Sequence, residues 1–340
     1  MNFPQFRPLL LLSVAVLLSA CFGKPRPTPP EPALPAVAVP PVKVGLALGG
    51  GAAKGFAHIG VIKVLEANGF EPVVVSGTSA GSVVGALYAS GMDPFALQRR
   101  AVALDEAQIR DVSLFSGGLI EGKALQDYVN SQVDRRPIER LGKPFAAVAT
   151  RLETGERIAF ARGNTGQAVR ASSSVPGVFE PVSIGQWHYV DGGVVSPVPV
   201  DAARDLGADF VVAVDISSKA SGQNPAHLLG IVNQSISIMG QKLGEQEMAR
   251  ADIVIRPRVT DIGAADFAQR ERAILEGEQA ALAAMPAIKA ALARLRAERV
   301  AAAKKAAAAR EKARAPKCVE RGAWLGVIDR EPDCSGAPTR

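Results

Sequence analysis

The sequence predicts an α/β fold with a largely parallel central sheet. Short apolar runs alternate along the chain with segments whose apolar residues recur every three or four positions, and this alternation is typical of parallel sheets. The first two apolar runs each lead through glycines into such a helical segment. The chain has 340 residues, of which 48% are hydrophobic and 21% charged, a composition that favours a globular protein with a large core.

The first half of the chain supplies the clearest strand and helix signals. Residues 42–50, "VKVGLALGG", predict a buried strand that ends in glycines, and residues 56–65 show helical spacing. The valines at residues 73–75 predict a second buried strand, because parallel strands are covered on both faces. After Gly81 the helical spacing returns, at Val83, Val84, Leu87 and Tyr88.

The second half continues the alternation, with strands expected at residues 145–150, 157–161, 187–190, 209–216 and 252–257. The first two of these are expected to pair across the turn "ETGE". Helical spacing dominates residues 266–295. Residues 297–317 are rich in alanine, lysine and arginine, so we expect a solvated surface helix with little apolar surface to bury; contact with anionic lipid or peptidoglycan is the alternative.

The N-terminus predicts an exported, lipid-anchored protein. Residues 1–20 combine a basic Arg7 with an apolar run too short to span a bilayer comfortably, as in a secretory signal peptide. The stretch "LLSAC" resembles the lipobox of bacterial lipoproteins, which implies that Cys21 becomes the acylated N-terminus. The residue after this cysteine is Phe22 and not an aspartate. By the same resemblance, this favours attachment to the outer membrane, with the protein facing the periplasm. The alternatives are a soluble exported protein and a short buried helix.

Two flanking segments complete the expected organisation. Residues 21–42 are crowded with proline and predict a semi-rigid tether. Residues 296–340 hold the basic helix and then Cys318 and Cys334, which we expect to form one disulfide in an oxidising periplasm. The formal charge of +6 arises largely near the C-terminus, so no uniformly basic nucleic-acid-binding face is expected. Such a charge suits an anionic membrane surface.

The stretch "GTSAG", residues 77–81, lies where the second strand gives way to a helix. This is the nucleophile-elbow pattern G-x-S-x-G, in which flanking glycines allow the strand and helix to approach closely while the serine stays exposed at the turn. Ser79 is therefore a candidate nucleophile. An ordinary tight turn is the alternative that this stretch alone leaves open.

The stretch "GGGAAKG", residues 49–55, follows the first strand and opens a helix. A phosphate-binding Walker loop needs serine or threonine after Lys54, where glycine stands. A looser dinucleotide-binding spacing survives, but the second strand ends without the acidic residue that binds a ribose. The preferred interpretation is an oxyanion loop in which the amides of Gly50 and Gly51 stabilise a tetrahedral intermediate. Lys54 adds positive charge there or is a solvated lysine at a helix start.

The base that such a site needs is not an obvious histidine. His58 has the spacing of a packed helix residue, His227 lies in a loop-like stretch, and the alternation in "WHYVDGG" places His188 on the face opposite Asp191. Asp191 ends a short strand and precedes Gly192 and Gly193, which permit a sharp turn. It is the remaining candidate base, although Asp-Gly is also a common turn.

Taken together, "GGGAAKG", "GTSAG" and "DGG" resemble the patatin-like phospholipase family, whose members are serine acyl hydrolases with a Ser-Asp dyad. Supporting stretches are "HIGVIKVLE", "GLIEGKAL", "ASSSVPGVFEPV" and "DGGVVSPVPVDAAR", and the likeness covers residues 43–295. It implies a three-layer α/β/α fold with a mostly parallel sheet. Ser196 is a departure, since relatives often have asparagine there.

The resemblance also implies the site residues: Ser79 as nucleophile, Asp191 as its base, and Gly49, Gly50 and Gly51 as the oxyanion loop, with no metal or cofactor. It implies a phospholipase A, lysophospholipase or esterase acting on phospholipids or other acyl-ester lipids. No nucleotide or nucleic acid is expected as a partner. The alternative is a catalytically idle patatin-like domain that binds lipid or a partner in the cell envelope.

Overall fold

The computed structural model describes residues 39–106, 109, 111, 120–217 and 228–314. The chain divides into two compact units. Val39–Ala302 holds the sheet and the candidate site; it includes the predicted catalytic domain, residues 43–295. The second unit comprises Met1–Ala38 and Ala303–Arg340, of which the structure describes a helical stretch, residues 303–314. The predicted signal peptide, residues 21–38 of the predicted tether, and the predicted disulfide lie outside the described residues.

The central sheet has the strand order β5-β6-β3-β2-β1-β7-β8, and β4 pairs with β3. Its strands are β1 (Val44–Leu48), β2 (Val74–Thr78), β3 (Phe145–Arg151), β4 (Arg157–Phe160), β5 (Val182–Ile184), β6 (Trp187–Asp191), β7 (Phe210–Val214) and β8 (Ile253–Ile255). The pairs β1–β2, β1–β7, β2–β3 and β7–β8 are parallel. The pairs of β3 with β4 and β6, and of β5 with β6, are antiparallel. A mostly parallel sheet is thus confirmed.

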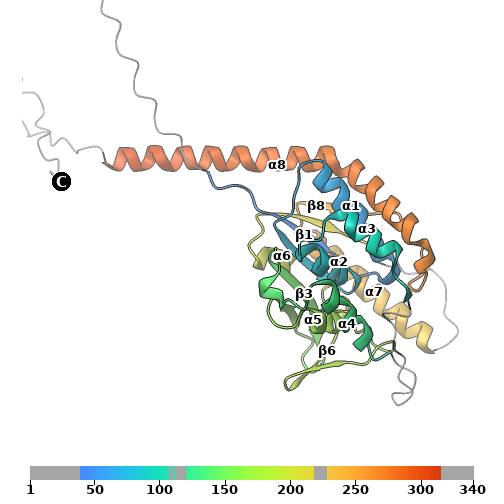
Figure 1. The fold of residues 1–340 in the computed structure, drawn as a ribbon. Helices are drawn as coiled ribbons and strands as arrows, with labels where there is room; N and C mark the ends of the chain where they lie inside the picture. The colour runs from blue at the N-terminus through green and yellow to red at the C-terminus, as the bar shows by residue number, and fades with distance from the viewer. Residues whose placement is uncertain (1–38, 107–108, 110, 112–119, 218–227, 315–340) are drawn as a thin grey trace, which may run out of the picture. The chain divides into compact units, whose positions relative to one another are not determined.

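Helices cover both faces of the sheet (Figure 1). The α-helices are α1 (Ala57–Ala67), α2 (Ala80–Ala89), α3 (Pro94–Val102), α4 (Lys123–Gln132), α5 (Thr165–Ser172), α6 (Val200–Asp205), α7 (Leu228–Met248) and α8 (Arg270–Arg314). Short 3-10 helices are η1 (Ala52–Phe56), η3 (Ile138–Arg140), η4 (Gly192–Val194) and η5 (Phe267–Gln269). Within the described residues, no helix is both long and apolar enough to cross a bilayer.

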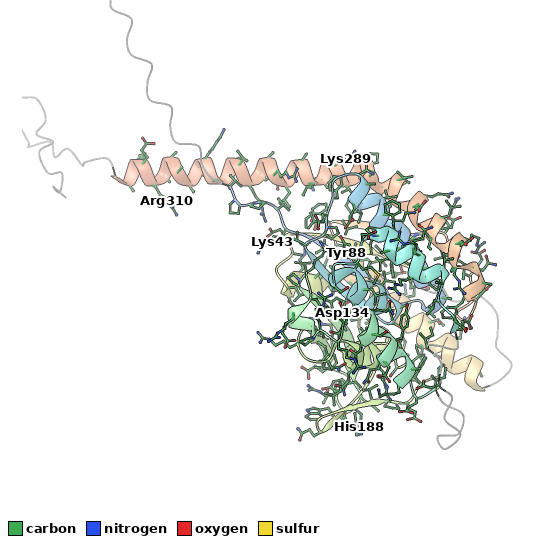
Figure 2. All side chains as sticks on the ribbon, viewed as in Figure 1. Lys43, Tyr88, Asp134, His188, Lys289 and Arg310 are labelled. Carbon is green, nitrogen blue, oxygen red and sulfur yellow. The ribbon has the colours of Figure 1, made fainter. Side chains whose placement is uncertain are left out.

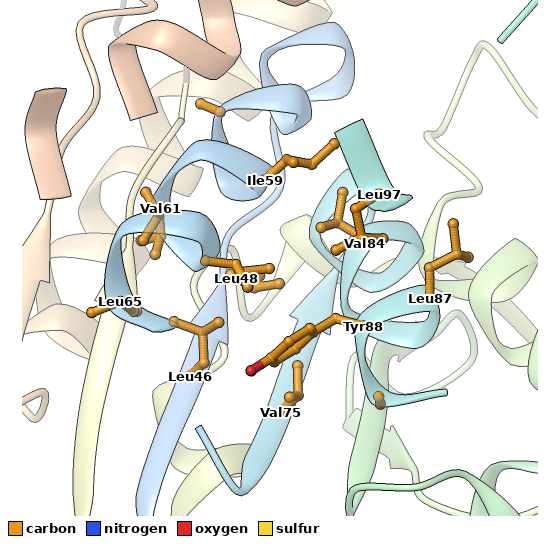
Figure 3. Packing of buried hydrophobic residues seen from close by; sticks show 14 of the residues in the cluster. Leu46, Leu48, Ile59, Val61, Leu65, Val75, Val84, Leu87, Tyr88 and Leu97 are labelled. Carbon is orange, nitrogen blue, oxygen red and sulfur yellow. The ribbon is translucent and has the colours of Figure 1, made fainter. Parts of the chain in front are cut away.

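The two faces of β1 show how the sequence builds three layers. Leu46 and Leu48 point into the larger core, with residues of α1, α2, α3 and α8, and Figure 3 shows this packing against Val75 of β2. Ala47 points into a second core with α6 and the end of α7. Because successive side chains of a strand face opposite sides, one continuous apolar run supplies both cores. The predicted α/β/α layering is confirmed.

One helix, α8, differs from the sequence prediction. Residues 266–295 and 297–317 were expected as separate helical stretches, but α8 runs unbroken from Arg270 to Arg314 with Pro286 inside it. It crosses α1 where both helices have glycine: a Cβ added to Gly60 or Gly277 would lie 2.0 Å from a backbone oxygen of the other helix. This contact depends on tertiary packing, which helical spacing alone does not report.

Candidate active site

Ser79 sits at a strained turn between β2 and α2. Its backbone has φ 53° and ψ −124°, a conformation that a non-glycine residue adopts only when its surroundings enforce it. The flanking glycines explain how: a Cβ on Gly77 would lie 2.3 Å from the Gly81 oxygen, and one on Gly81 would lie 2.2 Å from the Leu48 oxygen. The chain therefore forms the tight elbow that "GTSAG" predicts.

Hydrogen bonds hold this elbow from both sides. The Ser79 amide donates to Ser172 Oγ (2.9 Å), and the Ser172 hydroxyl in turn donates to the Val148 oxygen of β3 (2.6 Å). The Ser79 oxygen accepts from the amide of Ser82 (2.8 Å) and from its hydroxyl (2.7 Å). Ser172 belongs to the stretch "ASSSVPGVFEPV", so that stretch contributes a support for the strained residue.

The sheet register brings Asp191 next to this elbow. Thr78, the last residue of β2, pairs with Val148 of β3, and Asp191 of β6 pairs with the next residue of β3, Ala149. Strand β4 pairs with residues 147–150 of β3, and these include residues that also pair with β2 and with β6. A strand residue has one neighbour on each side, so β2 and β6 both lie on the side of β3 opposite β4. The ends of β2 and β6 therefore meet on one edge, where Ser79 follows Thr78.

The Asp191 carboxyl is buried, with 6% of the residue exposed. Its Oδ1 accepts from the Gly193 amide (2.6 Å). Burial raises the pKa of Asp191 to about 6, against the lowering influence of the Ser79 side chain and the Gly193 amide, because a charged group loses its hydration. The carboxyl is therefore a stronger base than a solvated aspartate.

The contact between Ser79 and Asp191 is close but not tightly aligned. The Ser79 side chain is near enough to lower the pKa of the carboxyl, yet Oδ2 accepts no hydrogen bond of ordinary geometry from the described residues. The Ser79–Asp191 contact is therefore longer or more bent than a full hydrogen bond. Catalytic hydrogen bonds often tighten only when substrate is bound.

The glycine loop faces the elbow as predicted, but it uses its amides differently. A Cβ on Gly50 would lie 3.3 Å from the Ser79 Cβ, so the loop backbone lies beside the candidate nucleophile. The amides of Gly49 and Gly50, however, donate to the oxygens of Val214 (3.0 Å) and Pro197 (2.9 Å). In this conformation neither amide is free for an oxyanion, which corrects their expected role as donors.

Two other amides remain available. Neither Gly51 nor Ala80 donates a backbone hydrogen bond within the part of the chain that the structure describes. Gly51 is the third glycine of the predicted loop, and an added Cβ there would lie 2.7 Å from the Ile216 oxygen. Ala80 follows the nucleophile and begins α2, the position that commonly supplies an oxyanion donor at such elbows. Sequence reasoning missed Ala80 because any residue type has an amide.

Lys54 of the glycine loop and His58 of α1 are both buried. Only 1% of Lys54 is exposed, so the alternative of a solvated lysine is wrong. Burial lowers the pKa of Lys54, and the charge of Asp215 opposes this. His58 Nε2 lies 2.8 Å from the Gly49 oxygen, and burial lowers its pKa to about 4. His58 is the packed helix histidine that its spacing predicts.

His188, the remaining histidine that the structure describes, does not join this site. His188 is exposed on β6 and lies 2.7 Å from Glu153 Oε1; Figure 2 shows it at the surface. His227, Cys21, Cys318 and Cys334 lie outside the described residues. Ser196 is fully buried and donates to Glu247 Oε1 (2.5 Å). Among the residues that the structure describes, no group of three or more histidines, cysteines or acids could hold a metal.

An apolar cavity of about 410 Å³ has Ser79 and Ala80 in its wall. Its walls come from η1, α2, α4 and the segment after α5, and include Phe56, Val83, Val84, Leu125, Val175 and Phe179. The size falls within the range of about 300–1,000 Å³ that is usual for small-molecule sites. A lining with so few polar groups suits a hydrocarbon chain better than a phosphate.

Known proteins are similar to part of this chain. Residues 46–204 match the model of the family described as patatin-like phospholipase. An uncharacterized NTE family protein of Mycobacterium tuberculosis is 36% identical over 186 residues, covering 53% of this chain and 51% of that protein. A patatin-like phospholipase domain-containing protein of Caenorhabditis elegans is 32% identical over 183 residues, covering 52% of this chain and 14% of that protein.

This chain spans about half the length of the mycobacterial relatives it matches, and less of the nematode one. Among solved structures, VipD from Legionella pneumophila has a TM-score of 0.46 at 17% identity, covering 72% of this chain and 67% of that chain. The type III effector protein ExoU has a TM-score of 0.43 at 16% identity, covering 75% and 54%. Over residues 46–204 the chain is therefore similar to the patatin-like phospholipase family.

Proposed function

We propose that this protein is a serine acyl hydrolase that cleaves acyl esters of phospholipids with a Ser79–Asp191 dyad. One observation carries the proposal: Ser79, which lines the apolar cavity, follows the end of β2 at the place where the sheet register puts the buried Asp191 of β6. A carboxylate is normally a weak base for a serine hydroxyl. Burial that raises the pKa of Asp191 to about 6 reduces this mismatch.

The reaction proceeds in two acyl-transfer steps. Ser79 Oγ attacks the ester carbonyl while its proton moves to Asp191, and the alcohol leaves with a proton as the acyl-enzyme forms. Water then attacks the acyl-enzyme, giving its proton to Asp191, and the fatty acid departs as Ser79 regains a hydrogen. The amides of Gly51 and Ala80 are the proposed donors to the oxyanion in both steps.

The cavity favours a single acyl chain as the bound group. Its volume is about 410 Å³ and its lining is apolar, so the chain of the scissile ester would be buried while the head group stays outside. Phospholipase A and lysophospholipase activities both satisfy this description. The nematode relative is named as a patatin-like phospholipase domain-containing protein, and this agrees with a lipid substrate.

The location is also a proposal. The lipobox-like "LLSAC" supports acylation of Cys21 and attachment to the outer membrane, facing the periplasm. The proline-rich residues 21–42 would then reach up to about 60 Å, at about 3.1 Å per residue, so the domain could work on the membrane that holds it. Incorporation of labelled palmitate into the full chain, and its loss in Cys21→Ser, tests the anchor.

The activity is tested by fatty-acid release from phospholipid vesicles and from lysophospholipid micelles. Ser79→Ala should lose about 10⁴-fold or more of the wild-type rate, and Asp191→Asn about 10⁴-fold. Matched controls are Ser235→Ala and Asp127→Asn, exposed residues on α7 and α4, which should keep full activity. Full activity in Ser79→Ala would overturn the dyad. Inactivity of the wild type on every ester lipid would favour the lipid-binding alternative.

A further inference from the structure

One short segment, Ser196–Pro199, is hydrogen-bonded to all three parts of the candidate site: the glycine loop, the Ser79 elbow and the loop after Asp191. Its Pro197 oxygen accepts from the Gly50 amide of the glycine loop (2.9 Å). Its Ser196 oxygen accepts from Thr78 Oγ1 (2.8 Å), one residue before the nucleophile.

The same segment is tied to the acid loop and to the body of β2. The Ser196 amide donates to the Gly192 oxygen (2.8 Å), one residue after Asp191. The Pro199 oxygen accepts from Ser76 Oγ of β2 (2.7 Å). A shift of this segment would therefore move the glycine loop, the elbow and the acid loop at once.

A single carboxyl group holds this segment from the other side. Glu247, near the end of α7, accepts from Ser196 Oγ at Oε1 (2.5 Å) and from the Val198 amide at Oε2 (2.9 Å). Both carboxyl oxygens of Glu247 therefore accept a hydrogen bond, one from each of the two residues that flank Pro197. A side chain that spans two donors in this way fixes both the position and the orientation of the peptide between them.

The Glu247 carboxyl is buried, with 5% of the residue exposed. Burial raises its pKa to about 7, against the lowering influence of the bonds from Ser196 and Val198, while Asp201 adds to the rise and Arg250 opposes it. The nearby Arg250 directs its guanidinium to Asp201 (2.7 and 2.8 Å) rather than to Glu247. Burying a carboxyl is costly, and an apolar side chain would fill the space without that cost.

We propose that Glu247 is a positioning residue of the acyl-transfer site: through Ser196 and Val198 it holds the segment to which the glycine loop, the Ser79 elbow and the Asp191 loop are hydrogen-bonded. The inference rests on the proposed function. Ser196 is the partner that supplies this carboxyl with a hydroxyl donor.

Glu247→Gln is the sharpest variant, because it keeps the size of the side chain. An amide presents one acceptor oxygen and one NH₂ donor, so it cannot accept from Ser196 Oγ and from the Val198 amide at two separate oxygens: either the Ser196 hydroxyl must turn to accept a bond, or one bond is lost. We expect kcat on a soluble p-nitrophenyl ester to fall about 10- to 100-fold, since a misplacement of about 1 Å can cost about 100-fold. KM should stay within about twofold, because the apolar cavity is untouched. Ser196→Ala removes one of the two bonds and should lose less.

The matched control is Glu245→Gln, an exposed acid two residues earlier on the same helix, whose carboxyl accepts from Gln241 and Lys242. It should keep the wild-type kcat. Hydrogen exchange at the Gly50 and Val198 amides gives a second readout that does not depend on activity: exchange should accelerate in Glu247→Gln and not in Glu245→Gln.

The outcomes separate the two proposals. A folded Glu247→Gln protein with wild-type kcat and unchanged exchange would overturn the positioning role and leave the hydrolase intact. The positioning role would also be overturned if the loss of kcat in Glu247→Gln and in Ser196→Ala were no larger than the fraction of each protein that is unfolded. Should the wild type hydrolyse no ester while exchange still accelerates in Glu247→Gln, the anchoring stands and the hydrolase proposal fails.

Discussion

His58 on α1 donates a hydrogen bond from Nε2 to the carbonyl oxygen of Gly49, 2.8 Å away. A carbonyl can only accept, so Nε2 carries the hydrogen, and the buried Nδ1 has no partner among the described residues. Burial lowers the pKa of His58 to about 4. The ring is therefore neutral near pH 7, and it supports the first glycine of the loop rather than serving as a general base.

This buried histidine should make the protein less stable in acid. The folded pKa of about 4 lies below the ordinary 6.5, so the unfolded chain binds a proton that the folded chain excludes. The stability from this group is complete above about pH 6.5 and is lost as the pH falls toward 4. At about 1.4 kcal/mol per pKa unit, roughly 2 kcal/mol should disappear between pH 7.5 and pH 5.

Urea unfolding of wild type and His58→Gln at both pH values measures this loss. Glutamine keeps a donor for the Gly49 oxygen but does not titrate, so the difference in free energy of unfolding between the two proteins should change by about 2 kcal/mol. His188→Gln is the matched control, because His188 is exposed and contacts Glu153. An equally large change in that control, or none in His58→Gln, would contradict the assignment.

The pH dependence of hydrolysis should report Asp191. As a base it must be ionised, and its pKa is raised to about 6, so kcat/KM should fall about tenfold per pH unit below pH 6 and level off above. Initial rates on a soluble ester between pH 4.5 and 8 measure this. Glu247 is a second buried carboxyl with a raised pKa. If Asp191 is the group that titrates, the fall of kcat/KM below pH 6 should also be seen in Glu247→Gln. A profile flat down to pH 4.5 would show that Asp191 is not the base.

The nucleophile and acid candidates were accessible from sequence because their local backbone demands specific residue types. The turn at Ser79 needs glycine at 77 and 81, where no Cβ fits, and these glycines make the motif visible. The position of Asp191 beside Thr78 was not accessible in the same way. It follows from the pairing of β6 and β2 with consecutive residues of β3, and a pairing between distant strands leaves no local pattern.

The detailed use of the glycine loop could not be predicted for the same reason. The sequence shows three glycines that can each offer an amide, but the acceptors that occupy Gly49 and Gly50 are Val214 and Pro197, far along the chain. The local sequence around Lys54 likewise resembles a helix start, where a lysine is usually solvated. Its burial follows from tertiary packing, which the local sequence does not report. Glu247 lies in a helix with no motif, so the contacts with Ser196 and Val198 were the only signal of its role.

Narrowing the cavity should change acyl-chain preference more than overall activity. Val83 on α2 lines the apolar cavity close to Ser79, and Val83→Phe would fill part of the space that a long chain needs. Overpacking of this kind costs about 1–3 kcal/mol, so kcat/KM for long-chain esters should fall by at least about fivefold while short-chain esters stay within about threefold. Comparison of p-nitrophenyl butyrate with the palmitate ester measures this, with the exposed Val73→Phe as control; equal losses on both esters would argue against an acyl-chain pocket.

The two glycines Gly81 and Gly244 should respond in opposite ways to alanine. A Cβ on Gly81 would lie 2.2 Å from the Leu48 oxygen, whereas one on Gly244 in α7 would meet its nearest atom, Pro197 Cγ, at 3.4 Å. Gly81→Ala must push the elbow away from β1, and we expect it to lose at least about 3 kcal/mol of stability and nearly all activity.

Gly244→Ala gains helix propensity without a clash and should be about 0.5–1 kcal/mol more stable than wild type. Soluble yield and urea unfolding of both variants test the pair. Because the same added methyl group is compared at both sites, a wild-type unfolding curve for Gly81→Ala would mean that β2 and α2 do not approach as closely as the elbow requires. The strained serine would then lack the packing that holds it in place.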